Sequence, residues 1–196
     1  GGNVQLGIYT LFCAVVFGIT FWVFPMGSWP GYILLVLGVL LGYVLFFKWA
    51  DPMVRLMGIS LYGSILLNLV LNGHFYPSLL EYQGGSTMAE RIEAESLEGE
   101  TLYKLSDQHT WAVDFYFGKP LEIVKITELP RASQTIWLYT DAKELEKLRN
   151  AGVIWDTEFT VDQFRISRLQ VRFLNPETRP EVLRQRHLVR IPGQRP

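Results

Sequence analysis

The chain has 196 residues, a formal net charge of −1 at pH 7 and 19% charged residues, which are ordinary averages for a soluble protein. The charges are unevenly distributed, because only Lys48, Asp51 and Arg55 are charged before His74, and sixteen basic and eighteen acidic residues follow it. The single cysteine, Cys13, excludes an intrachain disulfide. The composition therefore predicts a membrane protein with a water-soluble part, with the lipid bilayer as a partner and no nucleic-acid partner.

Three uncharged stretches are long enough to cross a lipid bilayer. They are residues 4–24, 31–47 and 57–75, which contain 21, 17 and 19 residues. At about 1.5 Å per residue, helices of these lengths reach roughly 25–31 Å, close to the thickness of about 30 Å of a hydrocarbon core. Three buried helices of a soluble protein are the alternative, which the short connections disfavour. Residues 1–75 are therefore predicted to form three transmembrane helices.

Basic residues indicate the orientation of these helices. The first connection, at 25–31, carries no charge, whereas Lys48 and Arg55 flank the second connection. Because basic residues favour the cytoplasmic side of a membrane, we expect the second connection in the cytoplasm. The carboxyl-terminal domain is then expected on the periplasmic, or extracytoplasmic, side of the inner (cytoplasmic) membrane.

Small residues four positions apart in each predicted span favour close packing between helices. The pairs are Ala14 with Gly18, Gly38 with Gly42, and Ser60 with Ser64. Asn68 is the one clearly polar side chain deep in a span. We expect it to form an interhelical hydrogen bond, and lining a cavity is the alternative.

Residues 76–86 are predicted to be an interfacial linker, and residues 87–196 a small soluble α/β domain. Helical and strand-like patterns alternate in this region, which predicts βαβ units and a sheet covered by helices. The expected strands lie at 101–106, 121–126 (buried), 134–140 and 153–159, with one or two more around a turn at Asn175–Pro176.

Three helices are expected in this domain, each with its own start or stop signal. The first is a helix at 88–97 with a capping box of Thr87 and Glu90. The second is a helix at 109–117 that Gly118 ends, with Trp111, Val113 and Phe115 facing inward. The third is capped by Asp141 with Glu144 and ended by Gly152, and its Ala142, Leu145 and Leu148 share a face.

The sequence contains no motif of a self-contained active site. It has no glycine-rich phosphate loop, and His74, His109 and His187 lie too far apart to suggest a metal site, so neither a metal nor a cofactor is predicted for this chain. Four arginines near the carboxyl end could hold a lipid phosphate or form a solvated charged surface, and nearby glutamates favour the second interpretation. These arginines are Arg179, Arg184, Arg186 and Arg190.

Three stretches resemble one family of bacterial membrane enzymes. They are HFYPSLLEYQGGSTMAE (74–90), directly after the last predicted span, DFYFGKPLEIV (114–124) and RISRLQVRFLNPETR (165–179). Together they resemble the carboxyl-terminal part of GT-C membrane glycosyltransferases of the glycosyltransferase 39, or aminoarabinose-transferase-like, superfamily, in a form associated with Bacteroidetes. With the predicted spans, the resemblance covers essentially the whole chain. Lys119 stands where the family usually has an arginine.

This resemblance implies a polytopic transferase that moves a sugar from a polyprenyl-phosphate donor to a lipid or protein acceptor at the outer face of the membrane. The family carries its catalytic acid in a first exoplasmic loop that has no counterpart in these residues, so no catalytic residue is carried over. The chain is therefore expected to be a fragment that packs against an upstream transmembrane bundle of the same protein, and to be inactive alone.

The boundary stretch supplies the candidate site residues, His74, Tyr76, Tyr82 and Gln83. One interpretation is that its aromatic side chains anchor the chain at the level of the lipid headgroups. The other is that these residues border the acceptor or polyprenyl cleft. Two other functions stay open, a three-span membrane-anchored binding or sensory protein with an extracytoplasmic α/β domain, and a structural subunit of a larger complex.

Overall fold

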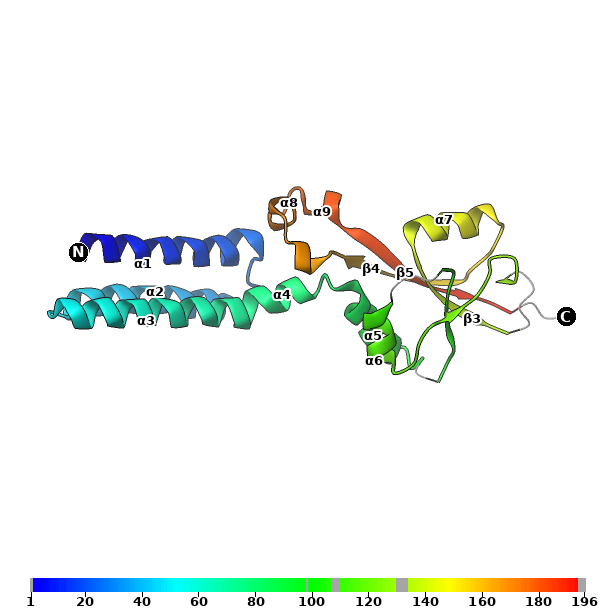
Figure 1. Ribbon diagram of the computed structural model, residues 1–196, viewed down its shortest axis with the longest axis horizontal. Helices are drawn as coiled ribbons and strands as arrows, with labels where there is room; N and C mark the ends of the chain where they lie inside the picture. The colour runs from blue at the N-terminus through cyan, green and yellow to red at the C-terminus, as the bar shows by residue number, and fades with distance from the viewer. Residues whose placement is uncertain (1, 98, 107–109, 130–133, 194–196) are drawn as a thin grey trace. The chain divides into compact units, whose positions relative to one another are not determined.

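The computed structural model describes residues 2–97, 99–106, 110–129 and 134–193 (Figure 1). The chain divides into two units. Unit 1 consists of Gly1–Leu80 together with Gln170–Arg179, and unit 2 of Glu81–Leu169 together with Pro180–Pro196. The segment Gln170–Arg179 thus belongs with the amino-terminal helices, although it lies in the carboxyl-terminal part of the sequence.

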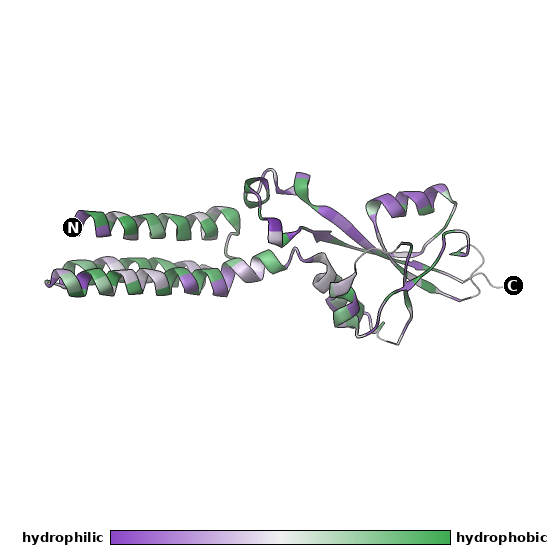
Figure 2. Cartoon of the chain, in the orientation of Figure 1, coloured by the Kyte–Doolittle hydropathy of each residue, from purple (hydrophilic) through white to green (hydrophobic). Residues whose placement is uncertain are grey.

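Unit 1 contains three helices that are long and apolar enough to cross a membrane, which confirms the number predicted from the sequence (Figure 2). The third of these helices extends to Leu80, beyond its predicted end at Phe75, and so includes the first residues of the predicted linker 76–86. The helices are α1 (Gly2–Phe17) continued by the π-helix η1 (Gly18–Val23), α2 (Trp29–Lys48), and α3 (Pro52–Val70) continued by the π-helix η2 (Leu71–Phe75) and α4 (Tyr76–Leu80); α8 (Val171–Leu174) completes the unit.

Close packing at Gly42 holds the three helices of unit 1 together. A side chain at this position would overlap the ring of Tyr9 from α1 and approach that of Tyr62 from α3. The Tyr9 hydroxyl donates a hydrogen bond to Val39 O (2.9 Å), and the Tyr62 hydroxyl donates one to Gly38 O (2.6 Å). The predicted packing role of the Gly38 and Gly42 pair is therefore confirmed.

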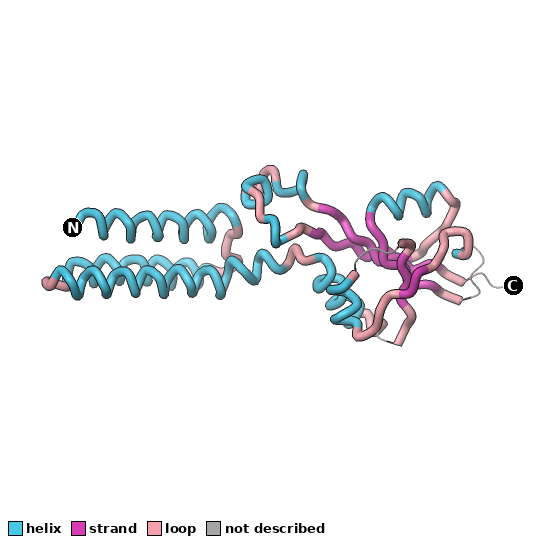
Figure 3. The backbone as a smooth tube through the Cα atoms, in the orientation of Figure 1, coloured by secondary structure: helices cyan, strands magenta, loops and turns pink. Residues whose placement is uncertain are grey.

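Unit 2 contains a five-stranded mixed sheet in the order β2-β1-β3-β5-β4 (Figure 3). β1 is parallel to both β2 and β3, and β5 is antiparallel to both β3 and β4. The predicted α/β class with a βαβ unit is confirmed, since the helix α6 (Trp111–Phe117) connects the parallel strands β1 and β2. The strands are β1 (Leu102–Lys104), β2 (Glu122–Ile123), β3 (Ile136–Asp141), β4 (Thr157–Gln163) and β5 (Arg184–Ile191).

The two faces of the sheet bury two separate cores. α6 and α5 (Gly84–Ala94) cover one face, where Tyr139 and Leu188 join the core. The helix α7 (Ala142–Asn150) covers the other face, where Leu138 and Val189 join the core. Successive residues of β3 and β5 thus alternate between the two cores, as the two-residue period of a strand requires.

The start and stop signals of α7 act as predicted. The Asp141 carboxylate accepts a hydrogen bond from Glu144 N (2.9 Å), and Gly152 adopts a left-handed φ of 72° just beyond the helix. Val153 N and Gly152 N donate back to Leu148 O and Arg149 O, which forms a Schellman cap. Leu145 and Leu148 are buried, whereas Ala142 is exposed and does not share their environment.

The prediction for α6 was wrong in which side chains point inward. Val113 is 1% exposed, but Trp111 and Phe115 are 74% and 78% exposed. This helix has only seven residues, so its apolar residues fit more than one face. The strand predicted at 121–126 is reduced to the exposed edge strand β2.

The predicted capping box of Thr87 and Glu90 is also wrong. α5 begins earlier, at Gly84, and the Thr87 hydroxyl donates to Glu81 O (3.1 Å). Close packing requires glycine at both Gly84 and Gly85. A Cβ at position 84 would lie 2.8 Å from the Gln163 side chain, and a Cβ at position 85 would lie 2.6 Å from Ala112 Cβ.

Candidate functional site

One end of unit 1 carries a cluster of aromatic and basic side chains, which we name the arginine cluster. It consists of Phe24, His74, Phe75, Phe173 and Arg179. The ring of Phe24 contacts Phe75 (centroids 5.7 Å apart) and Phe173 (6.3 Å apart). Residues from the first helix, the third helix and the segment Gln170–Arg179 therefore meet around one phenylalanine.

Arg179 joins the segment Gln170–Arg179 to the first helix. Its Nη2 donates to Val23 O (2.6 Å) and its Nε to Phe173 O (2.9 Å). The guanidinium carbon lies 4.5 Å from the centroid of the Phe24 ring and 5.3 Å from that of Phe173. Stacking on aromatic rings and hydrogen bonding to carbonyls are both typical of a partly buried arginine, and together they fix the orientation of the guanidinium.

His74, the first predicted site residue, is part of the same cluster. Its Nε2–H donates to Phe24 O (2.6 Å), across 50 residues of sequence. Phe24 follows η1, and His74 lies within η2, so this hydrogen bond connects the π-helical end of the first helix to the π-helical turn within the third helix. Because a π-helical turn leaves backbone groups displaced from the usual α-helical pattern, such turns often occur at functional sites.

The other three predicted site residues are divided between the two units. Tyr76 belongs to unit 1, where it is 47% exposed and its ring contacts Phe75 (5.6 Å between centroids). Tyr82 and Gln83 belong to unit 2 and contribute backbone contacts: Tyr82 O accepts from Phe164 N, and Gln83 O accepts from Ser86 at the start of α5.

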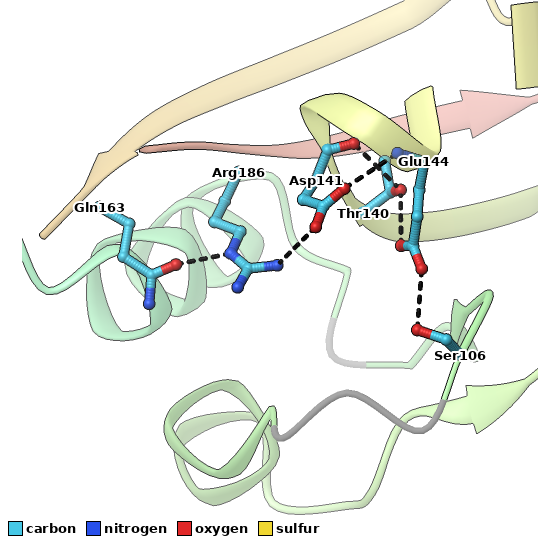
Figure 4. Close-up of polar contacts among 6 residues, drawn as sticks. All are labelled: Ser106, Thr140, Asp141, Glu144, Gln163 and Arg186. Carbon is cyan, nitrogen blue, oxygen red and sulfur yellow. Dashed lines mark hydrogen bonds and ion pairs between the residues drawn. The ribbon is translucent and has the colours of Figure 1, made fainter. Parts of the chain in front are cut away.

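A polar network in unit 2 surrounds the buried carboxylate of Glu144 (Figure 4). Ser106 Oγ donates to its Oε1 (2.8 Å), and Thr140 Oγ1 donates to its Oε2 (3.1 Å). Thr140 is 1% exposed and Glu144 is 8% exposed, so these hydrogen bonds compensate for the loss of water around the charge. The network ties α7 to β3 and to the residues after β1.

Arg186 extends this polar region to the end of β4 (Figure 4). Its Nε donates to Gln163 Oε1 (2.5 Å), and its Nη1 lies 3.9 Å from Asp141 Oδ2. Its guanidinium carbon also lies 5.9 Å from the centroid of the Tyr139 ring. Burial raises the pKa of the Tyr139 hydroxyl, and the nearby Arg186 charge partly opposes that rise.

His187 is a buried histidine on β5 with one ring nitrogen in a polar contact. Its Nδ1 lies 2.9 Å from Glu158 Oε1 and 3.1 Å from Thr160 Oγ1. Its Nε2 is buried and has no hydrogen-bond partner in the part of the chain that the structure describes. The residue is 5% exposed, so its ring lies inside the domain and is not presented to a substrate.

Unit 2 also has an open pocket of about 590 Å³ at the start of α7. Charged groups of both signs line it, so it offers donors and acceptors to a small dipolar molecule. Its lining residues include Asp141, Lys143, Asp162, Leu183, Arg184 and Gln185.

For the four arginines near the carboxyl end, a lipid-phosphate site was the less favoured interpretation and a solvated charged surface the favoured one; three of them belong to unit 2, where each has its own contacts. Arg190 forms a two-bond ion pair with Asp156 (2.7 and 2.6 Å), which lowers the pKa of Asp156. Arg186 binds Gln163, Arg184 lines the pocket, and Arg179 belongs to unit 1. Among the described residues no cluster of three histidine, cysteine or acidic side chains could hold a metal ion, and His109 lies outside those residues.

Sequence signals could have found only part of these sites. The cap at Asp141 led to Glu144, but nothing in the sequence pairs Arg179 with Val23. Comparisons of the chain with protein-family models, with curated proteins and with solved structures found no match.

Proposed function

We propose that unit 1 lies in the cytoplasmic membrane, with its three long apolar helices spanning the bilayer, and that unit 2 lies on the extracytoplasmic side. The lengths and compositions of the helices support insertion. Lys48 ends α2 and Arg55 lies in the first turn of α3, so both basic residues flank the connection between these helices, which supports a cytoplasmic position for it.

Within this arrangement we propose that the chain is the carboxyl-terminal part of a membrane glycosyltransferase. Its reaction would move a sugar from a polyprenyl-phosphate donor to a lipid or protein acceptor. The chain would contribute the binding of the lipid-linked phosphate rather than the catalytic acid, and further transmembrane helices of the same protein would pack against unit 1. The resemblance of residues 165–179 to this family supports the assignment.

The arginine cluster is the single observation that carries this proposal. Its Arg179 comes from the stretch that resembles the family, and it lies at the end of an apolar helix bundle. The Arg179 guanidinium, whose Nε and Nη2 bond to Phe173 O and Val23 O, is a fixed positive charge, which suits a phosphate group, and the surrounding phenylalanines suit an isoprenoid chain. A lipid-linked phosphate needs both kinds of contact at one place.

The test is a transfer assay with the protein expressed from its own gene and reconstituted in lipid nanodiscs. Radiolabelled polyprenyl-phosphate sugars are supplied with native lipid extract and membrane protein as acceptors. We expect transfer from at least one donor, and a rise in the KM for that donor of roughly tenfold or more in Arg179→Ala, since a charged hydrogen bond contributes about 1.5–3 kcal/mol. Arg172→Ala, an exposed arginine in the same segment, is the control. Absence of transfer from every donor would contradict the proposal.

The pocket at the start of α7 favours one alternative function, a membrane-anchored binding or sensory protein. Lys143 and Arg184 together with Asp162 would recognise a small dipolar ligand such as an amino sugar or an amino acid. A thermal-shift screen of the purified protein with such compounds tests this alternative. Binding that disappears in Arg184→Ala, in a protein without transferase activity, would favour it over the transferase.

A further inference from the structure

Residues 163–176 carry only positive charge. Between Asp162 and Glu177 the charged residues are three arginines, Arg165, Arg168 and Arg172. All three are exposed, and none of them forms a salt bridge in the part of the chain that the structure describes. We name residues 165–172, which contain these arginines, the basic segment.

Apolar side chains are exposed between the arginines of the basic segment. Val171 is 82% exposed and Leu169 is 44% exposed, whereas Phe173, two residues after Val171, is fully buried. The helix α8 therefore packs through Phe173 and leaves Val171 and Arg172 at the surface. Exposed aliphatic side chains interleaved with arginines are typical of protein segments that lie at a membrane surface.

The contacts of unit 1 fix where the end of the basic segment lies. The Arg179 side chain bonds to Val23 O, and the Phe173 ring contacts that of Phe24, the residue after η1. The candidate membrane span Gly2–Val23 ends at the first of these partners. Under the proposed membrane insertion, on which this inference rests, α8 therefore lies where the first span leaves the bilayer.

Exposed tryptophans mark the membrane surface at the same end of the helices. Trp22 is 54% exposed near the end of the first span, and Trp29 is 81% exposed at the start of α2. Tryptophan is enriched at the level of the lipid headgroups. Arg172 thus lies close to the phosphate groups of the surrounding phospholipids. Arg168 is four residues away, so its Cα lies within about 14 Å of that of Arg172.

We propose that the basic segment binds the headgroups of anionic phospholipids at the extracytoplasmic surface of the membrane. Its arginines pair with headgroup phosphates, and Leu169 and Val171 enter the apolar boundary beneath the headgroups. A bilayer surface offers both kinds of partner at one depth, whereas a transmembrane helix offers mainly apolar groups. The bound lipid is bulk phospholipid, so the KM for the sugar donor, which depends on Arg179, does not depend on the basic segment.

A fluorescent reporter in lipid nanodiscs tests this surface. The full protein carries the dye NBD on Val171→Cys, and the unmodified protein, whose Cys13 is buried, is the labelling blank. Discs of neutral phosphatidylcholine are compared with discs that contain about 30 mol% of anionic phosphatidylglycerol. NBD emission rises when the dye leaves water. We expect a rise of at least about twofold with phosphatidylglycerol and its loss in about 0.5 M salt, which screens exposed charges.

Two sets of substitutions identify the groups responsible. The test variant replaces the three arginines of the basic segment with glutamine, and the matched control replaces three exposed lysines of unit 2. The substitutions are Arg165→Gln, Arg168→Gln and Arg172→Gln in the test variant, and Lys125→Gln, Lys143→Gln and Lys147→Gln in the control. The test variant should lose the rise, because each basic residue strengthens association with an anionic surface about fivefold, and the control should keep it.

Each outcome decides the inference. Emission that is already high in neutral discs and does not respond to phosphatidylglycerol would show that another part of the protein covers Val171, and would overturn the inference. Equal loss of the rise in both variants would also overturn it. A rise with polyprenyl phosphate in neutral discs, and none with phosphatidylglycerol, would assign the arginines to the donor instead.

The same experiment separates this inference from the proposals on which it rests. Exclusion of the protein from nanodiscs would overturn the proposed membrane insertion and, with it, this inference. The NBD signal needs no sugar transfer. A response to anionic lipid in a protein without transferase activity would therefore support the inference and contradict only the proposed transferase.

Discussion

The guanidinium of Arg179 and the backbone carbonyl of Val23 lie 2.6 Å apart, although 156 residues separate them in the sequence. This hydrogen bond holds the segment Gln170–Arg179 against the end of the first helix. We expect Arg179→Ala to increase hydrogen–deuterium exchange in residues 170–179, because the side chain supplies the segment's hydrogen bond to Val23 and one of its contacts with Phe24, beside that of the Phe173 ring. Mass spectrometry of the purified protein measures this exchange. Arg172→Ala should leave it unchanged, and equal exchange in the two variants would show that Arg179 does not hold the segment.

The buried Glu144 network should contribute substantially to the stability of unit 2. Glu144→Ala removes the acceptor of the Ser106 and Thr140 hydroxyls, and leaving such groups unpaired costs about 1–3 kcal/mol. Urea unfolding followed by tryptophan fluorescence measures the free energy of unfolding. Glu146→Ala, an exposed position on the same helix, is the matched control and should change that free energy by less than about 0.5 kcal/mol. Similar losses in both variants would contradict a special role for Glu144.

Close packing at Gly42 should make this position intolerant of even one added methyl group. Gly42→Ala would force its Cβ against the rings of Tyr9 and Tyr62, and overpacking of this kind costs about 1–3 kcal/mol. We expect a lower melting temperature in detergent, measured by the static light scattering of the protein during heating. Gly7→Ala adds a methyl group where no atom lies within 4 Å and should leave the melting temperature unchanged. A tolerated Gly42→Ala would show that the helices do not pack through this glycine.

The ion pair of Asp156 with Arg190 predicts a defined pH dependence. The hydrogen bonds from Arg190 lower the pKa of Asp156 in the folded protein below its ordinary value of 3.8. The stabilisation is therefore complete above that ordinary value and is lost as the pH falls through the lower folded value. Asp156→Asn should melt at a lower temperature than the unmodified protein at pH 7, and the difference should disappear in strong acid. A difference that persists in strong acid would contradict the ion pair as its cause. Asp162→Asn, at an exposed residue of β4, the strand that follows Asp156, is the control.

Features encoded within a few residues were predictable from the sequence. The three long helices followed from uncharged stretches of membrane length, and α7 followed from its cap at Asp141 and its stop at Gly152. Each of these signals is local, because a helix forms its backbone hydrogen bonds within one turn.

Features that depend on distant residues were not predictable. The arginine cluster joins the first helix to a segment near the other end of the chain, and no sequence pattern indicates the π-helical turns before Phe24 and Tyr76. The inward face of α6 was assigned wrongly because Trp111 and Val113 are both apolar in a helix of only seven residues. Packing against α5 decides in favour of Val113.

The most direct test of the membrane arrangement is the accessibility of single cysteines in intact cells. Lys143→Cys lies on the exposed surface of unit 2, and Ala50→Cys lies in the connection between α2 and α3. A maleimide that does not cross the membrane is added before and after permeabilisation. We expect labelling of Lys143→Cys in intact cells and labelling of Ala50→Cys only after permeabilisation. Labelling of Ala50→Cys but not Lys143→Cys in intact cells would contradict the proposed orientation and, with it, an extracytoplasmic role for unit 2.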